Sequence, residues 1–202
     1  MHYFEKIGQS RYFLWTLLGL PFVFIVAAYS AGDMFYGEVL HSSGEISARL
    51  MIIAMAATPL SLMFSGRAFP RWLMKNRRYF GVASFAYAAL HTIVYLQRLQ
   101  LLPDILADAA IPEYWSGWVA LLIFLVLAAT SNDRSRRSLK RAWKKLHRFI
   151  YLGAALMFVH WVLIAFNRGP AIAHLAFLAA LEAYRLWKLR RITSIANRAN
   201  SL

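Results

Sequence analysis

Residues 77–98 read RRYFGVASFAYAALHTIVYLQR, an apolar run that begins with two arginines and carries one histidine, His91, toward its far end. A second run, residues 147–166, reads HRFIYLGAALMFVHWVLIAF and holds two more histidines, His147 and His160. An imidazole surrounded by hydrocarbon is costly unless it is bonded to a partner, so an ionisable residue inside such a run is a functional hypothesis by default. These two stretches indicate both the fold class and the candidate site.

The composition of the whole chain is that of a membrane protein. Of its 202 residues, 60% are hydrophobic and 16% are charged, whereas soluble domains are about half apolar. The net charge of +14 falls in short blocks between apolar runs, which is typical of cytoplasmic loops and not of a nucleic-acid-binding surface. The chain has no cysteine, which excludes disulfides, Cys-ligated iron–sulfur clusters and covalently attached c-type haem.

Six apolar runs are long enough, at about 20 residues, to cross a bilayer as helices. They occupy residues 12–31, 47–65, 79–97, 117–131, 148–166 and 170–187. Basic residues crowd the stretches 67–78, 134–145 and 185–198, whereas most charges in the other connections, Glu38 and Glu45 among them, are acidic. By the positive-inside rule both termini are cytoplasmic. We therefore predict an all-α integral membrane protein, a bundle of six transmembrane helices that forms a single domain over residues 1–202.

The depth of the histidines can be compared because the third and fifth predicted helices both run outward from the basic side. His91 lies 13 residues after Arg78, and His160 lies 13 residues after His147, which is a rise of about 20 Å in each case. His91 and His160 therefore share one level in the outer half of the membrane. Two imidazoles facing each other at one depth are what a six-coordinate haem b requires. Small residues precede both histidines and let a macrocycle approach, although such residues more commonly form a helix-packing seam.

His147 has no histidine partner at its own level, where the third helix offers Arg77 and Arg78. For this reason we favour one haem over two. His147 with Arg77 and Arg78 suggests a polar pocket at the inner face for a quinone head group or a flavin phosphate. The alternative is that all three are surface residues that meet anionic lipid.

The outer side carries few basic residues. Arg49, Arg98 and Arg168 are candidate partners of haem propionates, or anchors that reach from the membrane to its surface. His174 enters the sixth predicted helix from this side and is either a spare ligand or an interfacial residue.

The motifs at these positions resemble one known family. They are Thr58-Pro59-Leu60, Arg77-Arg78-Tyr79-Phe80-Gly81 before His91 and Tyr95, Thr130-Ser131, and Trp143-Lys144-Lys145-Leu146-His147-Arg148 before Tyr151 and His160. From about residue 43 to 187 the chain resembles the MsrQ (YedZ) family, the haem b membrane subunits of periplasmic methionine sulfoxide reductase systems. That family belongs to the ferric reductase-like transmembrane superfamily. Larger relatives hold two haems, and the missing second histidine on the third helix departs from their pattern.

The resemblance implies an electron conduit in the bacterial inner membrane. Proteins of this family take electrons from membrane quinol, or from a cytoplasmic flavin reductase, and pass them to a periplasmic molybdopterin enzyme that reduces oxidised methionine. By motif, His91 and His160 would hold the haem, and His147 would be an auxiliary or alternative ligand. Arg77 and Arg78 would lie near the site where electrons arrive from quinone or FMN.

Two other functions fit the same sequence. One is a membrane reductase of the same superfamily that hands electrons directly to ferric iron or another small acceptor. The other is a haem-free transporter or assembly scaffold whose histidines bind metal ions or protons. This last function predicts broken helices or charged residues near the middle of the membrane, and the sequence shows few of them.

Overall fold

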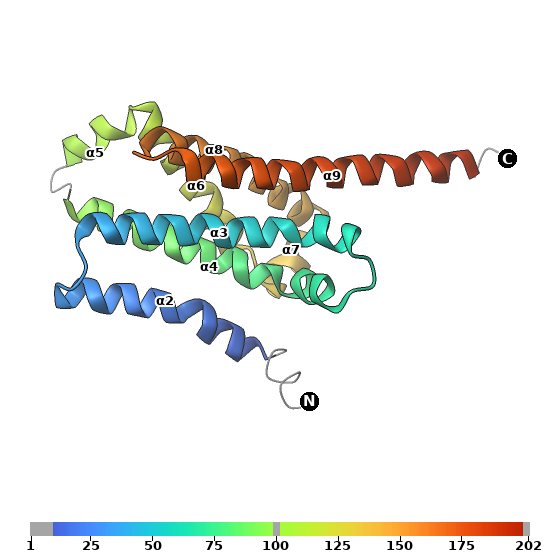
Figure 1. Cartoon of the computed structure of the whole chain (residues 1–202), viewed down its shortest axis with the longest axis horizontal. Coiled ribbons are helices and arrows are strands. Elements are labelled where there is room, and N and C mark those ends of the chain that lie inside the picture. The colour runs from blue at the N-terminus through green and yellow to red at the C-terminus, as the bar shows by residue number, and fades with distance from the viewer. Residues whose placement is uncertain (1–9, 99–101, 200–202) are drawn as a thin grey trace.

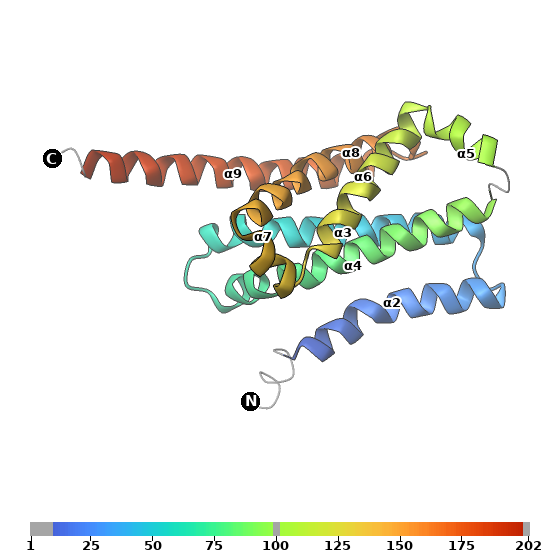
Figure 2. The same ribbon diagram turned by 180° about the vertical axis from the view of Figure 1, so that it is seen from behind.

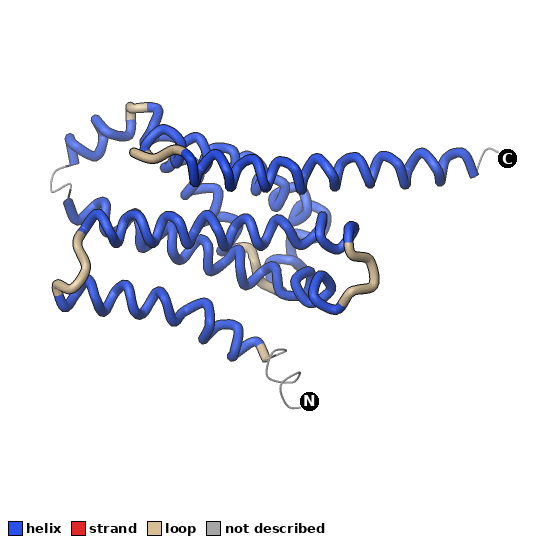
Figure 3. The backbone as a smooth tube through the Cα atoms, in the orientation of Figure 1, coloured by secondary structure: helices blue, strands red, loops and turns tan. Residues whose placement is uncertain are grey.

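Every regular element in the computed structural model, which describes residues 10–98 and 102–199, is a helix. The elements are α2 (Arg11–Ala31), α3 (Tyr36–Met63), α4 (Ala68–Arg98), α5 (Leu102–Ala109), α6 (Pro112–Ala129), α7 (Asp133–Leu146), the short 3-10 helix η1 (His147–Phe149), α8 (Ile150–Ile164) and α9 (Gly169–Ala199). Short connections join them (Figure 3). The prediction of an all-α protein is confirmed.

The bundle is built around the antiparallel pair α3 and α4. Helix α9 lies along α3, and α2 lies on the other side of the pair (Figure 1). The view from behind shows α6 and α8 in front of α3 and α4 (Figure 2). Helix α5 lies at one end of the bundle, whereas α7 and the connection between α3 and α4 lie at the other. Helix α2 begins at this second end, and α9 projects beyond it (Figure 1).

Among the described residues, five helical segments are long and apolar enough to cross a membrane. They are Arg11–Ala31, Tyr36–Met63, Ala68–Arg98, Pro112–Ala129 and Asp133–Ile164. Large apolar side chains such as Phe24 and Leu122 are exposed on their outer faces, as expected for helices that face lipid. Helix α9 is not among these five segments. It is longer than most of them, but Glu182 and Arg185 reduce its mean hydropathy. The two side chains form an ion pair, with Arg185 Nε 2.8 Å from Glu182 Oε2.

The second membrane helix begins earlier than the sequence analysis predicted. Helix α3 starts at Tyr36 and not near residue 47. The backbone N–H of Phe35 donates to Glu38 Oε2 at 2.8 Å, so a carboxylate in the first turn satisfies one of the free amides that every helix N-terminus leaves. Glu38 and Glu45, placed by the sequence analysis in an outer connection, therefore belong to the helix.

The basic stretch 134–145 is also helical and not a plain loop. Asn132 caps α7, because its Oδ1 accepts a hydrogen bond of 2.8 Å from the backbone N–H of Ser135. Lys and Arg have high helix propensity, so a capped run of them forms a helix even where its polar character keeps it off the core. Lys140 interrupts it with a positive φ of 48°.

Two serines join α3 to α4 inside the bundle. Ser47 Oγ donates to the carbonyl of Ser84 at 2.9 Å, and Ser84 Oγ donates to the carbonyl of Ser47 at 2.8 Å. Both residues are buried. Small side chains let the two helices approach closely enough for these reciprocal bonds, which hold helices together where lipid offers no hydrophobic driving force.

Replacing Ser47 or Ser84 by alanine should each lower the free energy of unfolding by about 1 kcal/mol, because an interhelical hydrogen bond is lost. The measurement is unfolding of the purified protein in mixed detergent micelles. Ser43→Ala is the matched control, since buried Ser43 donates within its own helix, to the carbonyls of Val39 and Leu40. An equal loss in the control would contradict an interhelical role.

Candidate functional site

A cavity of about 770 Å³ lies between α3, α4, α6 and α8, a size within the usual range of ligand pockets. Its wall is mostly apolar and aromatic, and it contains His91 from α4 and His160 from α8. The small residues of the wall are Gly44, Ala48, Ala88, Gly117 and Ala120. The cavity is therefore a mostly apolar chamber whose wall includes the imidazoles of His91 and His160 from two different helices.

The structure brings His91 and His160 together, as the residue count from the basic side predicts. Their ring centres are 6.2 Å apart and their planes are nearly perpendicular, at 86°. An imidazole nitrogen lies about 1.1 Å from its ring centre and bonds a metal ion at about 2.0–2.1 Å, so two rings sharing one ion have centres roughly 6.2–6.4 Å apart. The observed separation fits one metal atom between the two rings.

Both histidines use the same ring nitrogen to bind the backbone. His91 Nδ1 lies 2.9 Å from the carbonyl oxygen of Leu40, and His160 Nδ1 lies 2.7 Å from that of Glu113. A carbonyl oxygen can only accept, so each Nδ1 carries the hydrogen and donates. The second nitrogen, Nε2, is then an unprotonated donor atom, which is the arrangement that metal-binding histidines adopt.

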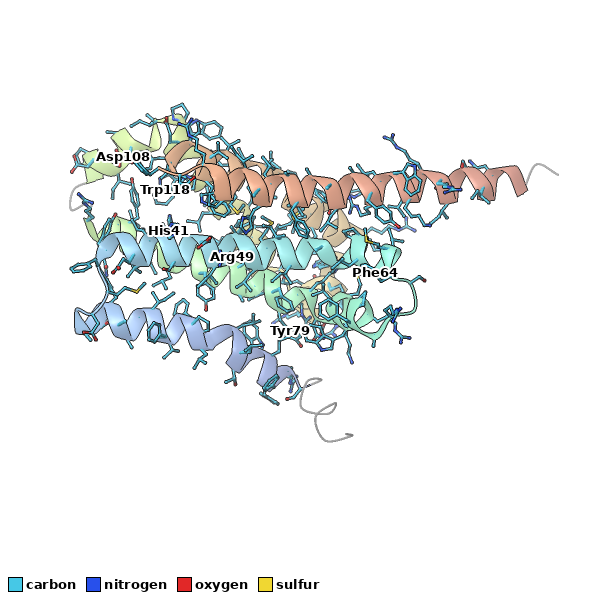
Figure 4. All side chains as sticks on the ribbon, in the orientation of Figure 1. His41, Arg49, Phe64, Tyr79, Asp108 and Trp118 are labelled. Atoms are coloured by element: carbon cyan, nitrogen blue, oxygen red, sulfur yellow. The ribbon has the colours of Figure 1, made fainter. Side chains whose placement is uncertain are left out.

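The end of the cavity nearest α5 is more polar. Arg98 lines it, with its guanidinium carbon 5.1 Å from the centre of the Tyr36 ring. Tyr95 also lines it and donates to Asp108 Oδ2 at 2.6 Å. Figure 4 shows Asp108 and Trp118 at this end of the molecule. Of the three outer arginines, Arg98 is the one found among the described residues of the cavity wall.

Glu45 lies within α3 and not in an outer connection, and Arg49 lies farther from the outer end of α3 than the run 47–65 predicted. Gly44 contacts the ring of His91, so Glu45 is at the level of the histidine pair and Arg49 is about 6 Å deeper. The two form an ion pair, with Arg49 Nη2 2.5 Å from Glu45 Oε1. Figure 4 shows Arg49 partway along α3. The sequence does contain a signal that both residues belong to one helix: they are four residues apart, the spacing of a helical ion pair.

His147 lies outside this cavity, at the junction between α7 and α8. Its Nε2 is 3.1 Å from Thr130 Oγ1, and its ring stacks on Trp143 with centres 3.9 Å apart. Trp143 in turn donates from Nε1 to the carbonyl of Thr130 at 3.0 Å. His147 is thus held by α6 and α7, away from the histidine pair.

The two arginines at the start of the apolar part of α4 have different surroundings. Arg77 donates to Thr58 Oγ1 at 3.2 Å and lies close enough to His147 for their charges to interact. Arg78 forms an ion pair of 2.9 Å with Asp133. It also lines a small pocket of about 290 Å³ between α2, α4 and the connection after α6. Neither Arg77 nor His147 is part of that pocket's described lining.

His174 lies on α9 beside Trp161, with ring centres 5.3 Å apart. Its Nδ1 is 2.7 Å from the carbonyl oxygen of Pro170. The described wall of the large cavity includes Trp161 but not His174.

Comparison with known proteins identifies the family. Residues 43–158 match the profile described as ferric reductase like transmembrane component. The protein-methionine-sulfoxide reductase heme-binding subunit MsrQ of Rhizobium meliloti (strain 1021) is 35% identical over 76% of this chain and 70% of its own length. The subunit of the same name from Cronobacter sakazakii is 33% identical over 85% of this chain and 88% of its own. No solved structure matches. The chain belongs to the ferric reductase-like transmembrane family and, within it, to the MsrQ proteins.

Arg49→Met should lower the free energy of unfolding by about 2 kcal/mol, because among apolar helices it removes the guanidinium that pairs with the Glu45 carboxylate and leaves only His41 Nε2, 3.7 Å away, beside it. The double variant Arg49→Met with Glu45→Gln should recover most of this loss, since no charge is left without its partner. The measurement is again unfolding in mixed micelles. Equal losses in the single and double variants would show that the pair is not coupled.

Proposed function

We propose that this protein is a haem b-binding electron-transfer subunit of a methionine sulfoxide reductase system in the bacterial inner membrane. The observation that carries the proposal is the pair His91 and His160, 6.2 Å apart in an apolar cavity, each with its Nδ1 bonded to a helix carbonyl. The related MsrQ proteins are named as heme-binding subunits of such a reductase. The residues of this chain fit the group that those names imply.

His91 and His160 are the proposed axial ligands. A haem held in this way supplies one-electron transfer and leaves no coordination position for oxygen or substrate. The apolar wall excludes water from the cavity, and the two carbonyl bonds keep both Nε2 atoms unprotonated. Arg98, at the polar end of the cavity, is the proposed partner of a propionate, because its charge lies where a carboxylate can leave the apolar chamber.

We place the protein in the membrane with six spanning helices and both termini in the cytoplasm. Helix α9 supplies the sixth span. It packs along α3, and its residues Ala171, Leu178 and Leu181 are buried. The opposite charges of Glu182 and Arg185 neutralise each other in an ion pair. The basic first turns of α4, helix α7 and the last turns of α9 lie at one end of the bundle (Figure 1), as the positive-inside rule expects of the cytoplasmic face.

In this proposal electrons move from this basic end toward the end of the bundle that carries α5. The proposed donor is membrane quinol or a cytoplasmic flavin reductase, and the proposed acceptor is a periplasmic molybdopterin methionine sulfoxide reductase subunit. Arg77, Arg78 and His147 lie at the donor end and are the proposed contacts of a quinone head group or of FMN. The pocket beside Arg78 supports this assignment for Arg78 in particular.

The absorption spectrum of the purified protein tests the ligand pair. We expect a low-spin b-type spectrum that is lost in His91→Ala and in His160→Ala, because each substitution removes one axial ligand. His174→Ala is the control and should leave the spectrum unchanged. A colourless, folded protein would refute the haem proposal, and a spectrum unaffected by either of the first two substitutions would refute the pair.

The haem-to-protein ratio of His147→Ala tests whether one haem or two is bound. We expect the ratio to be near one in the parent and unchanged in the variant, because His147 is bonded to Thr130 and lies outside the cavity. Reduction of the haem by added menaquinol or ubiquinol should nevertheless be slower in the variant if His147 contacts the donor. A ratio near two in the parent that falls in the variant would make His147 a ligand.

A further inference from the structure

Two glycines face the outer edges of the two imidazoles. A Cβ atom built on Gly44 of α3 would lie 3.1 Å from His91 Nδ1 and 3.3 Å from its Cε1. A Cβ atom on Gly117 of α6 would lie 2.6 Å from His160 Nδ1 and 2.8 Å from its Cε1. A side chain at Gly117 would therefore clash with the His160 ring, and one at Gly44 would press against the His91 ring.

The same geometry occurs at both positions. The carbonyl that accepts from His91 belongs to Leu40, four residues before Gly44, and the carbonyl that accepts from His160 belongs to Glu113, four residues before Gly117. In an α-helix the carbonyl of residue i−4 accepts from the N–H of residue i. Each of these carbonyls thus accepts from a backbone N–H of its own helix and from an imidazole. A serine hydroxyl three residues on also donates to it, Ser43 Oγ to Leu40 at 3.3 Å and Ser116 Oγ to Glu113 at 3.1 Å.

The absence of a side chain makes this second bond accessible. A Cα–Cβ bond in a helix tilts toward the N-terminus, so the Cβ of residue i partly covers the turn before it. Without a Cβ at position i, an imidazole can lie against the backbone and reach the carbonyl one turn earlier from the side. Alanine at Gly117 would occupy the position of the ring itself.

We propose that Gly44 and Gly117 are positioning residues that hold the two histidine rings in place, and that the same arrangement occurs on two separate helices. Each glycine exposes the carbonyl one turn before it, and that carbonyl fixes Nδ1–H and leaves Nε2 as the metal-binding atom. The inference rests on the proposed haem ligation by His91 and His160. It adds that the ligand geometry is set by α3 and α6, two helices that carry no axial ligand themselves.

The chain offers matched controls for steric and packing effects. Gly37 on α3 and Gly81 on α4 have nothing within 4 Å of the built Cβ, so alanine there brings only the gain in helix propensity, up to about 1 kcal/mol. Gly153 on α8 is equally tight, with the built Cβ 2.8 Å from Phe124 Cε1, but it contacts no histidine. Gly153→Ala therefore disturbs packing without touching a ligand.

The test is the absorption and electron paramagnetic resonance spectrum of each purified variant, together with its haem-to-protein ratio. Gly117→Ala should lose most of the low-spin two-histidine signal, because the His160 ring must leave its carbonyl. Gly44→Ala, with the longer contact, should keep its haem but show shifted resonance values. Gly37→Ala and Gly81→Ala should match the parent, and Gly153→Ala should lose stability while the haem it retains keeps the parent spectrum.

Combining Gly117→Ala with His160→Ala distinguishes a role of Gly117 in positioning the His160 ring from a general loss of stability. With the imidazole gone the alanine has room, so the double variant should have the spectrum and stability of His160→Ala alone, even if Gly117→Ala itself folds poorly. A parent without low-spin haem would refute the proposed function. If the parent does bind such a haem, either of two results would overturn the glycine inference: Gly117→Ala keeps the parent spectrum, or Gly153→Ala changes the spectrum as much as Gly117→Ala does.

Discussion

The hydrogen bond between an imidazole Nδ1–H and a helix carbonyl is the interaction on which the site depends. The core of a bilayer offers no water to an unsatisfied polar group, so each imidazole must find its partner within the protein. Here the partners are Leu40 on α3 and Glu113 on α6. A backbone carbonyl within a helix cannot rotate as a side chain does. The two rings are therefore held by rigid elements, and α3 and α6 are fixed relative to α4 and α8.

Other polar groups in the bundle obey the same constraint. Ser47 and Ser84 satisfy each other's carbonyls between α3 and α4, and Tyr87 donates to the carbonyl of Leu18 on α2 at 2.8 Å. Two ion pairs lie within single helices, Glu45 with Arg49 on α3 and Glu182 with Arg185 on α9. Because local partners satisfy these groups, the cavity wall is mostly apolar around the imidazoles of His91 and His160. A cavity of this kind favours a large, mostly apolar ligand that needs two nitrogen donors.

The sequence analysis was most accurate where one-dimensional counting is sufficient. Helices rise by a constant amount per residue, so equal spacing of His91 and His160 from the basic side predicted equal depth. It was wrong about the start of α3, because a single carboxylate at Glu38 extends the helix across residues that read as a polar connection. That error placed Glu38 and Glu45 in an outer connection and Arg49 at the outer end of the second apolar run. The stretch 134–145 was assigned to a connection for a similar reason, although its capped, basic sequence forms α7.

By itself the sequence determined an all-helical membrane protein, the basic character of one end, and the two histidines that share a depth. These follow from composition and from the period of a single helix. Only the tertiary structure decided which carbonyls receive the imidazole protons, that Gly44 and Gly117 face the rings, and that His147 lies apart from the cavity. The physical reason is that these features depend on the rotation of each helix about its axis. Packing against neighbouring helices sets that rotation, and counting residues along one chain does not reveal it.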